Sequence, residues 1–534
     1  MRAPCDEVAI RSVDRAVPCR PDSRTWILAA TILASSMAFI DSTVVNVALP
    51  SIQSSFHATV VDVQWVVESY GIFLGALILA GGSLGDRFGR RLMFLIGVAI
   101  FAMASAWCGL ATDTRQLIIA RSVQGLGAAL LVPGSLAIIS TSFDEKSRGR
   151  AIGTWSGFTA ITTAVGPLLG GWLVEHASWR WAFFINLPIA VAVAAISLWH
   201  IPESRDLTTT RVDWAGALLA SFGLGGLVYG FIESATLGWL RPLVVVSLVV
   251  GFGCMIAFTF VEARIESPMV PLALFESRSF SGANLLTLFL YSAIGIFFFL
   301  LPLNLIQVQG YSSTAAGAAM LPMILLMFLL SRWSGGLVAR YGPRTPLIIG
   351  PLIVALGFLL FTVPSIGDSY WRVLFPATVV LGFGMAVTVA PLTTVVMNSV
   401  SLDRVGAASG INNAVARVAG VLAIAVFGIV MVNAFGFHLN RSLDHLALLS
   451  DAAQQIKADE IKLAGLQVPA GLNPDAADAI RQSIGTAFVF GFRVIMLICA
   501  GLSLAGSAIV WQMIPAQSNT EEAYSWQQSR KLAS

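Results

Sequence analysis

The sequence predicts an all-α membrane protein with fourteen transmembrane helices. Only 11% of its 534 residues are charged and 56% are hydrophobic, whereas a soluble chain carries about 25% charged residues. So few charged side chains cannot cover the surface of a water-soluble protein of this length. Apolar runs of about 20 residues, which is the length that crosses a bilayer as a helix, recur along the chain. The net charge of +3 is too small to indicate a nucleic-acid partner, so the expected surroundings are the lipid bilayer.

The predicted helices are the fourteen apolar segments. In chain order they are 25–49, 61–82, 92–111, 116–140, 150–174, 181–201, 213–233, 242–262, 282–308, 316–339, 345–363, 371–399, 405–434 and 483–512. Some are longer than a bilayer requires, so we expect tilted helices or extensions beyond the membrane. Residues 1–24 are not expected to be a signal peptide, because the apolar run that follows is too long and has no clear cleavage site.

The loops predict the orientation of the protein. Those on the side of the N-terminus carry thirteen Lys and Arg residues, and those on the other side carry four. Cytoplasmic loops of membrane proteins carry the excess of such residues. We therefore expect a multi-pass protein of the cell inner (plasma) membrane with both termini in the cytoplasm.

One connection is long. Residues 435–482 lie between the last two predicted helices and contain apolar residues at helical spacing. Asn473 is placed as a helix cap, and Pro474 follows it at the first helical position, where proline is favoured. The pattern predicts a small helical hairpin on the outer face.

Residues 81–91 read GGSLGDRFGRR. The arginines are ordinary for a cytoplasmic loop, but the loop position explains neither Asp86 nor the glycines at 82, 85 and 89. A second stretch, GGLVARYGPR at 335–344, matches residues 82–91 at five positions and has Ala339 in place of Asp86. Such a copy indicates a chain built from two related halves, with the seventh and eighth helices inserted between them.

Four further stretches narrow the family: DSTVVNVALPSI (41–52), LIIARSVQGLGAALLVPGS (117–135), AVGPLLGG (164–171) and SWRWAFFINLP (178–188). Together with 81–91 they resemble the fourteen-helix drug:proton antiporter branch of the major facilitator superfamily, over roughly residues 25–512. The resemblance implies the major facilitator fold. It places six-helix bundles at 25–201 and 266–512, two inserted helices at 202–265, an outer loop at 435–482, and cytoplasmic tails at 1–24 and 513–534.

The function implied by the resemblance is proton-coupled export of amphiphilic, often cationic drugs by alternating access. The alternative is an exporter of one endogenous metabolite or lipid-like compound on the same fold. The sequence carries no P-loop, nucleophile elbow, metal cluster or catalytic histidine constellation, so we expect no enzyme activity, no cofactor and no metal. The expected partners are a small-molecule substrate and protons, and the expected state is a monomer.

Charged residues within apolar helices are the candidate coupling residues, because a buried ion at the membrane centre costs about 3 kcal/mol. Asp41 and Arg121 lie at similar predicted depth, so we expect them to face one cavity, either paired or joined through water. The resemblance implies that Asp41 is the coupling acid and Arg121 its proton-linked arginine, and the alternative is a static ion pair. Glu68 is a second candidate acid, with an equal chance of facing the outer headgroups.

The resemblance also implies a conformational switch. It places Asp86 against a helix N-terminus in the other half, where backbone N–H groups favour a carboxylate. The other expected switch residues are Gly82, Arg87, Gly89 and Arg90, with Gly166 and Pro167 as a helix break that the family associates with exporters. The alternative for the last two is a routine kink.

Polar, aromatic and methionine side chains are candidates for the substrate cavity, because such surfaces adapt to varied compounds. The alternative is that they face lipid. The candidates are Asn46, Gln124, Phe298, Asn304, Gln307, Met385, Asn412 and Arg417.

Overall fold

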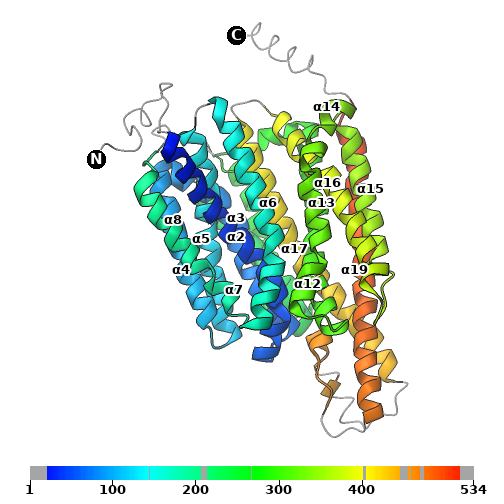
Figure 1. The fold of residues 1–534 in the computed structure, drawn as a ribbon. Helices are drawn as coiled ribbons and strands as arrows, with labels where there is room; N and C mark the ends of the chain where they lie inside the picture. Colours follow the sequence, from blue (N-terminus) through cyan, green and yellow to red (C-terminus); the bar gives the residue numbers. More distant parts are fainter. Residues whose placement is uncertain are drawn as a thin grey trace.

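The structure is a computed structural model that describes residues 21–143, 145–205, 213–265, 268–400, 404–444, 455–456, 459–469 and 474–516. The described residues form helices and turns without any strand, arranged as one bundle of long helices (Figure 1). This confirms the predicted all-α class. Thirteen helices are long and apolar enough to cross a membrane, and Arg344–Leu360 is a shorter apolar helix. The described chain therefore has an apolar helix at each of the fourteen predicted places.

A first group of helices comes from the N-terminal part of the chain. Its members are α2 (Pro21–Phe56), α3 (Val60–Phe88), α4 (Arg90–Leu110), α5 (Thr114–Ser142), α6 (Glu145–His176), α7 (Trp181–Phe184) and α8 (Asn186–His200). Two helices follow, α9 (Trp214–Leu237) and α10 (Pro242–Glu262). Helix α10 packs on α9, and α9 contacts both α3 and α17. The outward residues of α10, such as Val249 and Phe260, are more than half exposed, as expected for a helix that faces lipid.

The second group follows a short turn, η1 (Leu272–Glu276). Its members are α11 (Arg278–Leu303), η2 (Asn304–Val308), α12 (Ser313–Ala319), α13 (Leu321–Gly335), α14 (Leu337–Tyr341), α15 (Arg344–Leu360), η3 (Tyr370–Leu374), α16 (Phe375–Asn398), α17 (Val405–Leu443), η5 (Glu460–Gly465) and α19 (Pro474–Met513). The short α15 packs between α16 and α19, so it is an integral member of the bundle despite its length.

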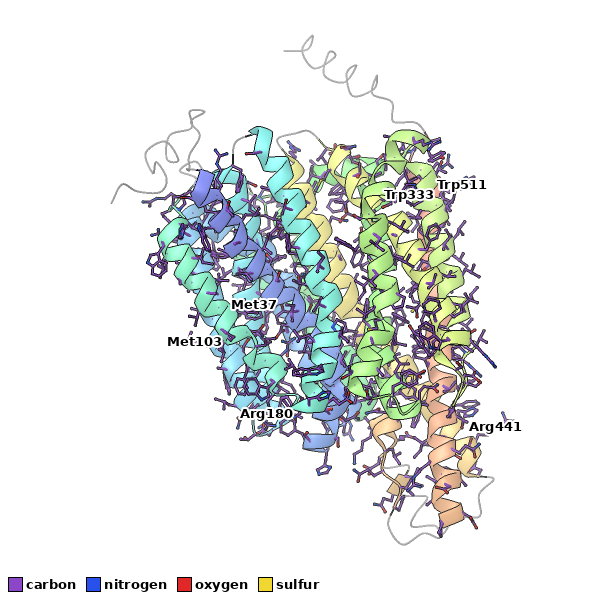
Figure 2. The ribbon with its side chains drawn as sticks, in the orientation of Figure 1. Met37, Met103, Arg180, Trp333, Arg441 and Trp511 are labelled. Carbon is purple, nitrogen blue, oxygen red and sulfur yellow. The ribbon has the colours of Figure 1, made fainter. Side chains whose placement is uncertain are left out.

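The two ends of the described chain lie at the same end of the bundle. Helix α2 begins at this end and α19 ends at it (Figure 1). Trp333 and Trp511 lie at the same end, and Arg180 and Arg441 lie at the opposite end (Figure 2). We call these the terminal end and the distal end.

The segment 435–482 differs from its prediction. Helix α17 continues to Leu443 and α19 already begins at Pro474, so both helices project beyond the bundle at the distal end (Figure 1). The rest of what is described there includes the helical residues 455–456 and one short turn, η5. Pro474 does stand at the first helical position, whereas Asn473 lies outside the described residues. Much of the predicted hairpin, including 445–454 and 457–458, also lies outside the described residues, so the hairpin stays a prediction.

Caps at the helix starts position the central side chains. Helix α3 begins with a capping box, in which the Thr59 and Asp62 side chains each accept from the other's backbone N–H. Helix α5 begins where the Asp113 carboxylate accepts from the Gln116 backbone N–H at 2.8 Å. Each cap satisfies a backbone donor that the first turn leaves unpaired. The caps thereby fix the starts of the two helices that carry Glu68, Tyr70, Arg121 and Gln124.

Candidate functional site

A cluster of buried polar side chains lies inside the first group of helices. Arg121 Nη1 donates to Asp41 Oδ2 at 2.5 Å and to Gln124 Oε1 at 2.6 Å. Arg121 Nε donates to the Val66 carbonyl at 3.1 Å. Both charged side chains are at most 1% exposed. The structure therefore brings the predicted pair together directly, and the guanidinium joins α2, α3 and α5.

Neutral side chains complete the hydrogen bonding of Asp41. Its Oδ1 accepts from Gln124 Nε2 at 2.7 Å and from Asn186 Nδ2 at 3.2 Å. The same two amides also donate to Ser105 Oγ, at 2.8 and 3.2 Å. A buried ion pair is destabilising unless its remaining hydrogen-bonding capacity is used, and here each carboxylate oxygen has a partner. The carboxylate is thus fully hydrogen-bonded although it is shielded from solvent.

Glu68 on α3 is in the opposite situation. Its side chain is fully buried, and neither carboxyl oxygen has a hydrogen-bond partner among the described residues. The alternative that Glu68 faces the outer headgroups is therefore wrong. Two residues on the same face of α3 contact α17. Gln64, one turn before Glu68, donates to the Ile424 carbonyl at 3.2 Å. Gly71, about one turn after Glu68, faces Val421. Glu68 thus lies on the side of α3 that meets α17 of the second group.

Tyr70 connects the cluster to the seam between the groups. The Arg121 guanidinium carbon lies 4.3 Å from the centre of the Tyr70 ring, a cation–π distance. The Tyr70 hydroxyl is buried without a hydrogen-bond partner in the described chain. The charges of Asp41, Arg417 and Arg121 all act on Tyr70, so the ring is near both the ion pair and an arginine of the second group.

The loop 81–91 is held within its own group. Asp86 pairs with Arg90, with 2.6 Å between Oδ1 and Nη2. Residues 401–403, just before α17 of the other group, lie outside the described residues. The carboxylate at a helix start is that of Glu203, which accepts from the backbone N–H groups of Arg91 and Leu92, both at 3.1 Å. This contact lies within the first group, so it is distinct from the contact with the other group that the resemblance implies for Asp86, which stays a prediction.

The two related stretches occupy equivalent places. Gly89 and its counterpart Gly342 both have positive φ, 119° and 76°, which glycine adopts without strain. A side chain at Gly89 would meet Glu203, and one at Gly342 would meet the Ala516 carbonyl. Each glycine thus faces the segment that follows the last helix of its own group.

The aligned arginines repeat this relation. Arg91 Nη1 donates to the Ile201 carbonyl, which follows α8, at 2.9 Å. Arg344 Nη2 donates to the Trp511 carbonyl, near the end of α19, at 2.5 Å. The stretch therefore ties the start of one helix to the end of another in both groups. The two groups differ in the acceptor that lies beside the glycine. In the first group this acceptor is the Glu203 carboxylate, and in the second it is the Ala516 backbone carbonyl.

The two groups meet along two seams. Along the first, α3 contacts α17 from Gln64 near the distal end to Leu79, which faces Gly410. Along the second, α6 contacts α12, where Gly171 faces the Ser313 backbone and Gly317 faces the Pro167 backbone. Further toward the terminal end of α6, a side chain at Gly157 would meet no described atom within 4 Å. The second seam is therefore closed at the distal end.

Polar contacts reinforce the distal closure. Gln307 Nε2 donates to Gln53 Oε1 at 2.8 Å, which joins η2 to α2. The Thr314 backbone N–H donates to Glu175 at 3.1 Å, which joins α12 to α6. The Gln53 amide also donates to the Lys462 carbonyl in η5 at 3.1 Å, and η5 contacts helices of both groups.

The other predicted switch and cavity residues are spread through the bundle. Gly166 faces Thr43 on α2, and Gly82 lies against Pro133. Pro167 stands inside α6, which remains one helix from Glu145 to His176. Arg87 is exposed and lies beside Phe88. Asn412 donates hydrogen bonds to Asn284 and Thr287 inside the second group. The remaining cavity candidates are partly or fully buried: Asn46, Phe298, Asn304 and Met385.

Several residues of the site were not predicted. Asn186 lies in the stretch SWRWAFFINLP, which carried the family resemblance without a role for this side chain. Ser105, Tyr70 and Gln53 sit among apolar residues with no pattern that separates them from packing positions. Glu203 offered one signal, a carboxylate directly after a predicted helix. In the described part of the chain, no three His, Cys, Asp or Glu residues come together as a metal site would require.

Comparisons with known proteins agree with this architecture. The sequence matches the Major Facilitator Superfamily over residues 31–424. It is 33% identical over 508 residues to the multidrug resistance protein Stp of Mycobacterium tuberculosis, covering 93% of this chain and 94% of Stp. It is 32% identical over 494 residues to the tetracenomycin C resistance and export protein of Streptomyces glaucescens, covering 91% of both chains.

Solved structures are similar in fold. A bacterial homologue of the human lysosomal transporter Spinster, crystallised in an inward-facing, unoccupied conformation, aligns with a TM-score of 0.64 at 18% identity, covering 94% of this chain and all of that one. A D-xylose–proton symporter aligns with a TM-score of 0.57 at 14% identity, covering 92% of this chain and 98% of the symporter.

Proposed function

The chain belongs to the Major Facilitator Superfamily, a family of membrane transporters and not of enzymes, and on this premise we propose that it exports amphiphilic drugs in exchange for protons. The relatives named for drug resistance or drug export, which match more than nine-tenths of the chain, support a drug exporter. The proposal adds proton coupling, the orientation in the plasma membrane and a monomeric state.

The observation that carries the coupling proposal is the buried Asp41–Arg121 pair. An arginine stays protonated, whereas a carboxylate can bind and release a proton. Loss of the contact with Arg121 would leave Asp41 as a buried carboxylate without a counter-ion, and such a group is stable only after it binds a proton. Movement of α2 against α5 therefore links the state of the bundle to proton binding at Asp41.

Alternating access follows from the two groups moving against each other. We place the terminal end in the cytoplasm, because the loops there carry the excess of Lys and Arg. The distal closure then blocks the outer side, and opening it would require the Gln53–Gln307 bond and the α6–α12 contacts to separate. In that opposite state we expect Asp86 to leave Arg90 and to contact the second group, as the family resemblance implies.

The driving force is sufficient for this cycle. One charge that crosses a potential of 100 mV supplies about 2.3 kcal/mol, which is more than one tenfold step in concentration. Binding of a proton on the outer side and its release in the cytoplasm would return the protein to the state described here.

The test is transport by purified protein in vesicles with an acidic lumen. The wild type should accumulate ethidium as long as the pH gradient lasts, and Asp41→Asn should not. Glu262→Gln is a matched control, because Glu262 is also a buried acid but lies at the end of α10, away from the ion pair. Accumulation by Asp41→Asn at the wild-type rate would remove Asp41 from the mechanism.

A further inference from the structure

Arg417 is a cation in the middle of a membrane-length helix without a counter-ion in the described chain. It lies on α17, and its guanidinium makes no hydrogen bond or ion pair with any described residue. The Phe39 ring on α2 lies beside it, with its centre 5.4 Å from the guanidinium carbon. A charge inside a membrane helix is costly and normally marks a pathway for ions or substrate. Arg417 is therefore expected to have an anionic partner.

Arg417 faces the first group of helices across the seam. A Cβ atom at Gly75 on α3 would lie 3.7 Å from the Arg417 Cβ atom, so the base of the arginine side chain packs close to α3. The titratable groups that act on Arg417 are Tyr70 on α3 and Tyr291 on α11. The Tyr70 hydroxyl is buried and, among the described residues, unpartnered. Donors from both groups of helices therefore surround one place on the seam.

The charges around this place do not balance. Arg121 is neutralised by Asp41, whose oxygens are already occupied. The sequences of α11 to α17 contain no Asp or Glu within the helices, and the acids of α19 lie in its distal extension. Neither carboxyl oxygen of Glu68 on α3 has a hydrogen-bond partner among the described residues, so Glu68 does not pair with Arg417. Within the described chain, Arg417 has no anion to neutralise it.

We propose that Arg417, with the Tyr70 hydroxyl, binds an acidic group on the exported compound, so that the preferred substrates are amphiphilic acids. A guanidinium can bind a carboxylate through two parallel hydrogen bonds, and a tyrosine hydroxyl can supply a third donor. The Phe39 ring offers an apolar surface beside the charge. This substrate class extends the cationic drugs expected from the sequence, and it rests on the proposed export function.

The test uses three pyrene compounds that differ mainly in charge: 1-pyrenebutyrate, its methyl ester and 1-pyrenemethylamine. Binding to the full-length protein in detergent is followed by energy transfer from tryptophan to pyrene. The wild type should bind the acid most tightly. Arg417→Gln should weaken binding of the acid by about tenfold or more and change binding of the ester by less than about threefold. Arg417→Lys should keep part of the affinity, because it keeps the charge but loses the planar fork.

Other outcomes would overturn the proposal. An equal loss for all three compounds would show that Arg417 supports the fold and not the acid. If Glu68→Gln restored the affinity of Arg417→Gln, the arginine would serve Glu68. If chloride displaced pyrenebutyrate while the wild type bound acid and ester equally, the site would hold a small inorganic anion. Because binding is measured without a gradient, a failure of proton-driven transport would be seen separately, in vesicles.

Discussion

At the scale of single residues, the two buried acids of the first group are in contrasting environments. Asp41 accepts hydrogen bonds from Arg121, Gln124 and Asn186, whereas Glu68 accepts none from the described residues. Burial penalises a charge that has no partner far more than one that is paired and fully hydrogen-bonded. We therefore expect proton binding at Asp41 to depend on whether Arg121 stays in contact with it. The environment of Glu68 offers no partner for a charge.

Replacing Arg121 tests the pairing. Arg121→Ala should lower the free energy of unfolding by about 3–5 kcal/mol, because it leaves the buried Asp41 without a counter-ion. Arg121→Lys should keep partial export, since it retains the charge but cannot reach Asp41, Gln124 and the Val66 carbonyl together. Thermal unfolding and vesicle transport would measure the two effects. The exposed Arg481, substituted in the same two ways, is the control, and an equal response at both positions would refute the pairing account.

Replacing Glu68 separates coupling from packing. Glu68→Gln keeps the size of the side chain and removes the titratable proton, so the protein should unfold at the same temperature or a higher one. Export should lose part of its dependence on pH. Transport across a series of pH gradients would show this, with Glu233→Gln as the control, since Glu233 instead accepts a bond from Trp65 near the distal end. Unchanged transport combined with lower stability would mean that Glu68 is a packing residue only.

At the scale of elements, glycines determine how closely the helices approach. Gly171 and Gly317 allow α6 and α12 to meet backbone to backbone at the distal end. Gly89 and Gly342 allow the segment after the last helix of each group to pack on the loop before Arg90 or Arg344. The first contacts join the two groups, and the second join helix ends within each group.

Substitutions on one helix can test the distal closure. Gly171→Ala should disfavour the closed distal end, because its methyl group would collide with the Ser313 backbone. Gly157→Ala on the same helix has open space around it in the described structure and should have no such effect. Distances between spin labels on the distal ends of α6 and α12 should lengthen in the first variant alone. Equal distances in both variants would show that this seam does not set the conformation.

Glu203 can be tested as the acid that binds the start of α4. Glu203→Ala should destabilise the protein by about 1 kcal/mol, through loss of hydrogen bonds to two backbone N–H groups and of a favourable charge at a helix N-terminus. Thermal unfolding would detect this loss. Asp478→Ala, which breaks the exposed pair with Arg481, should change little. If the two variants lost the same amount of stability, the Glu203 carboxylate would not stabilise the start of α4.

At the scale of the whole molecule, the sequence predicted the helices and the ion pair better than the connections. Apolar runs identify membrane helices because the bilayer imposes their length. Asp41 and Arg121 could be identified because they are charged residues within such runs. The partners of Asp86 and Glu203 depend on which loop folds over which helix end, and no local pattern encodes that. Arg417 and the Phe39 ring come together only when the two groups assemble, so a cation without a counter-ion at this seam can be recognised only in the three-dimensional structure.

The most direct test of proton-coupled export is the release of protons when a substrate binds. Purified protein in weakly buffered detergent solution would receive a saturating amount of an exported dye, and a pH indicator would record the protons released. We predict release from the wild type and from Glu262→Gln, and none from Asp41→Asn. Release from Asp41→Asn equal to that of the wild type would contradict the central claim that this carboxylate exchanges its proton during export.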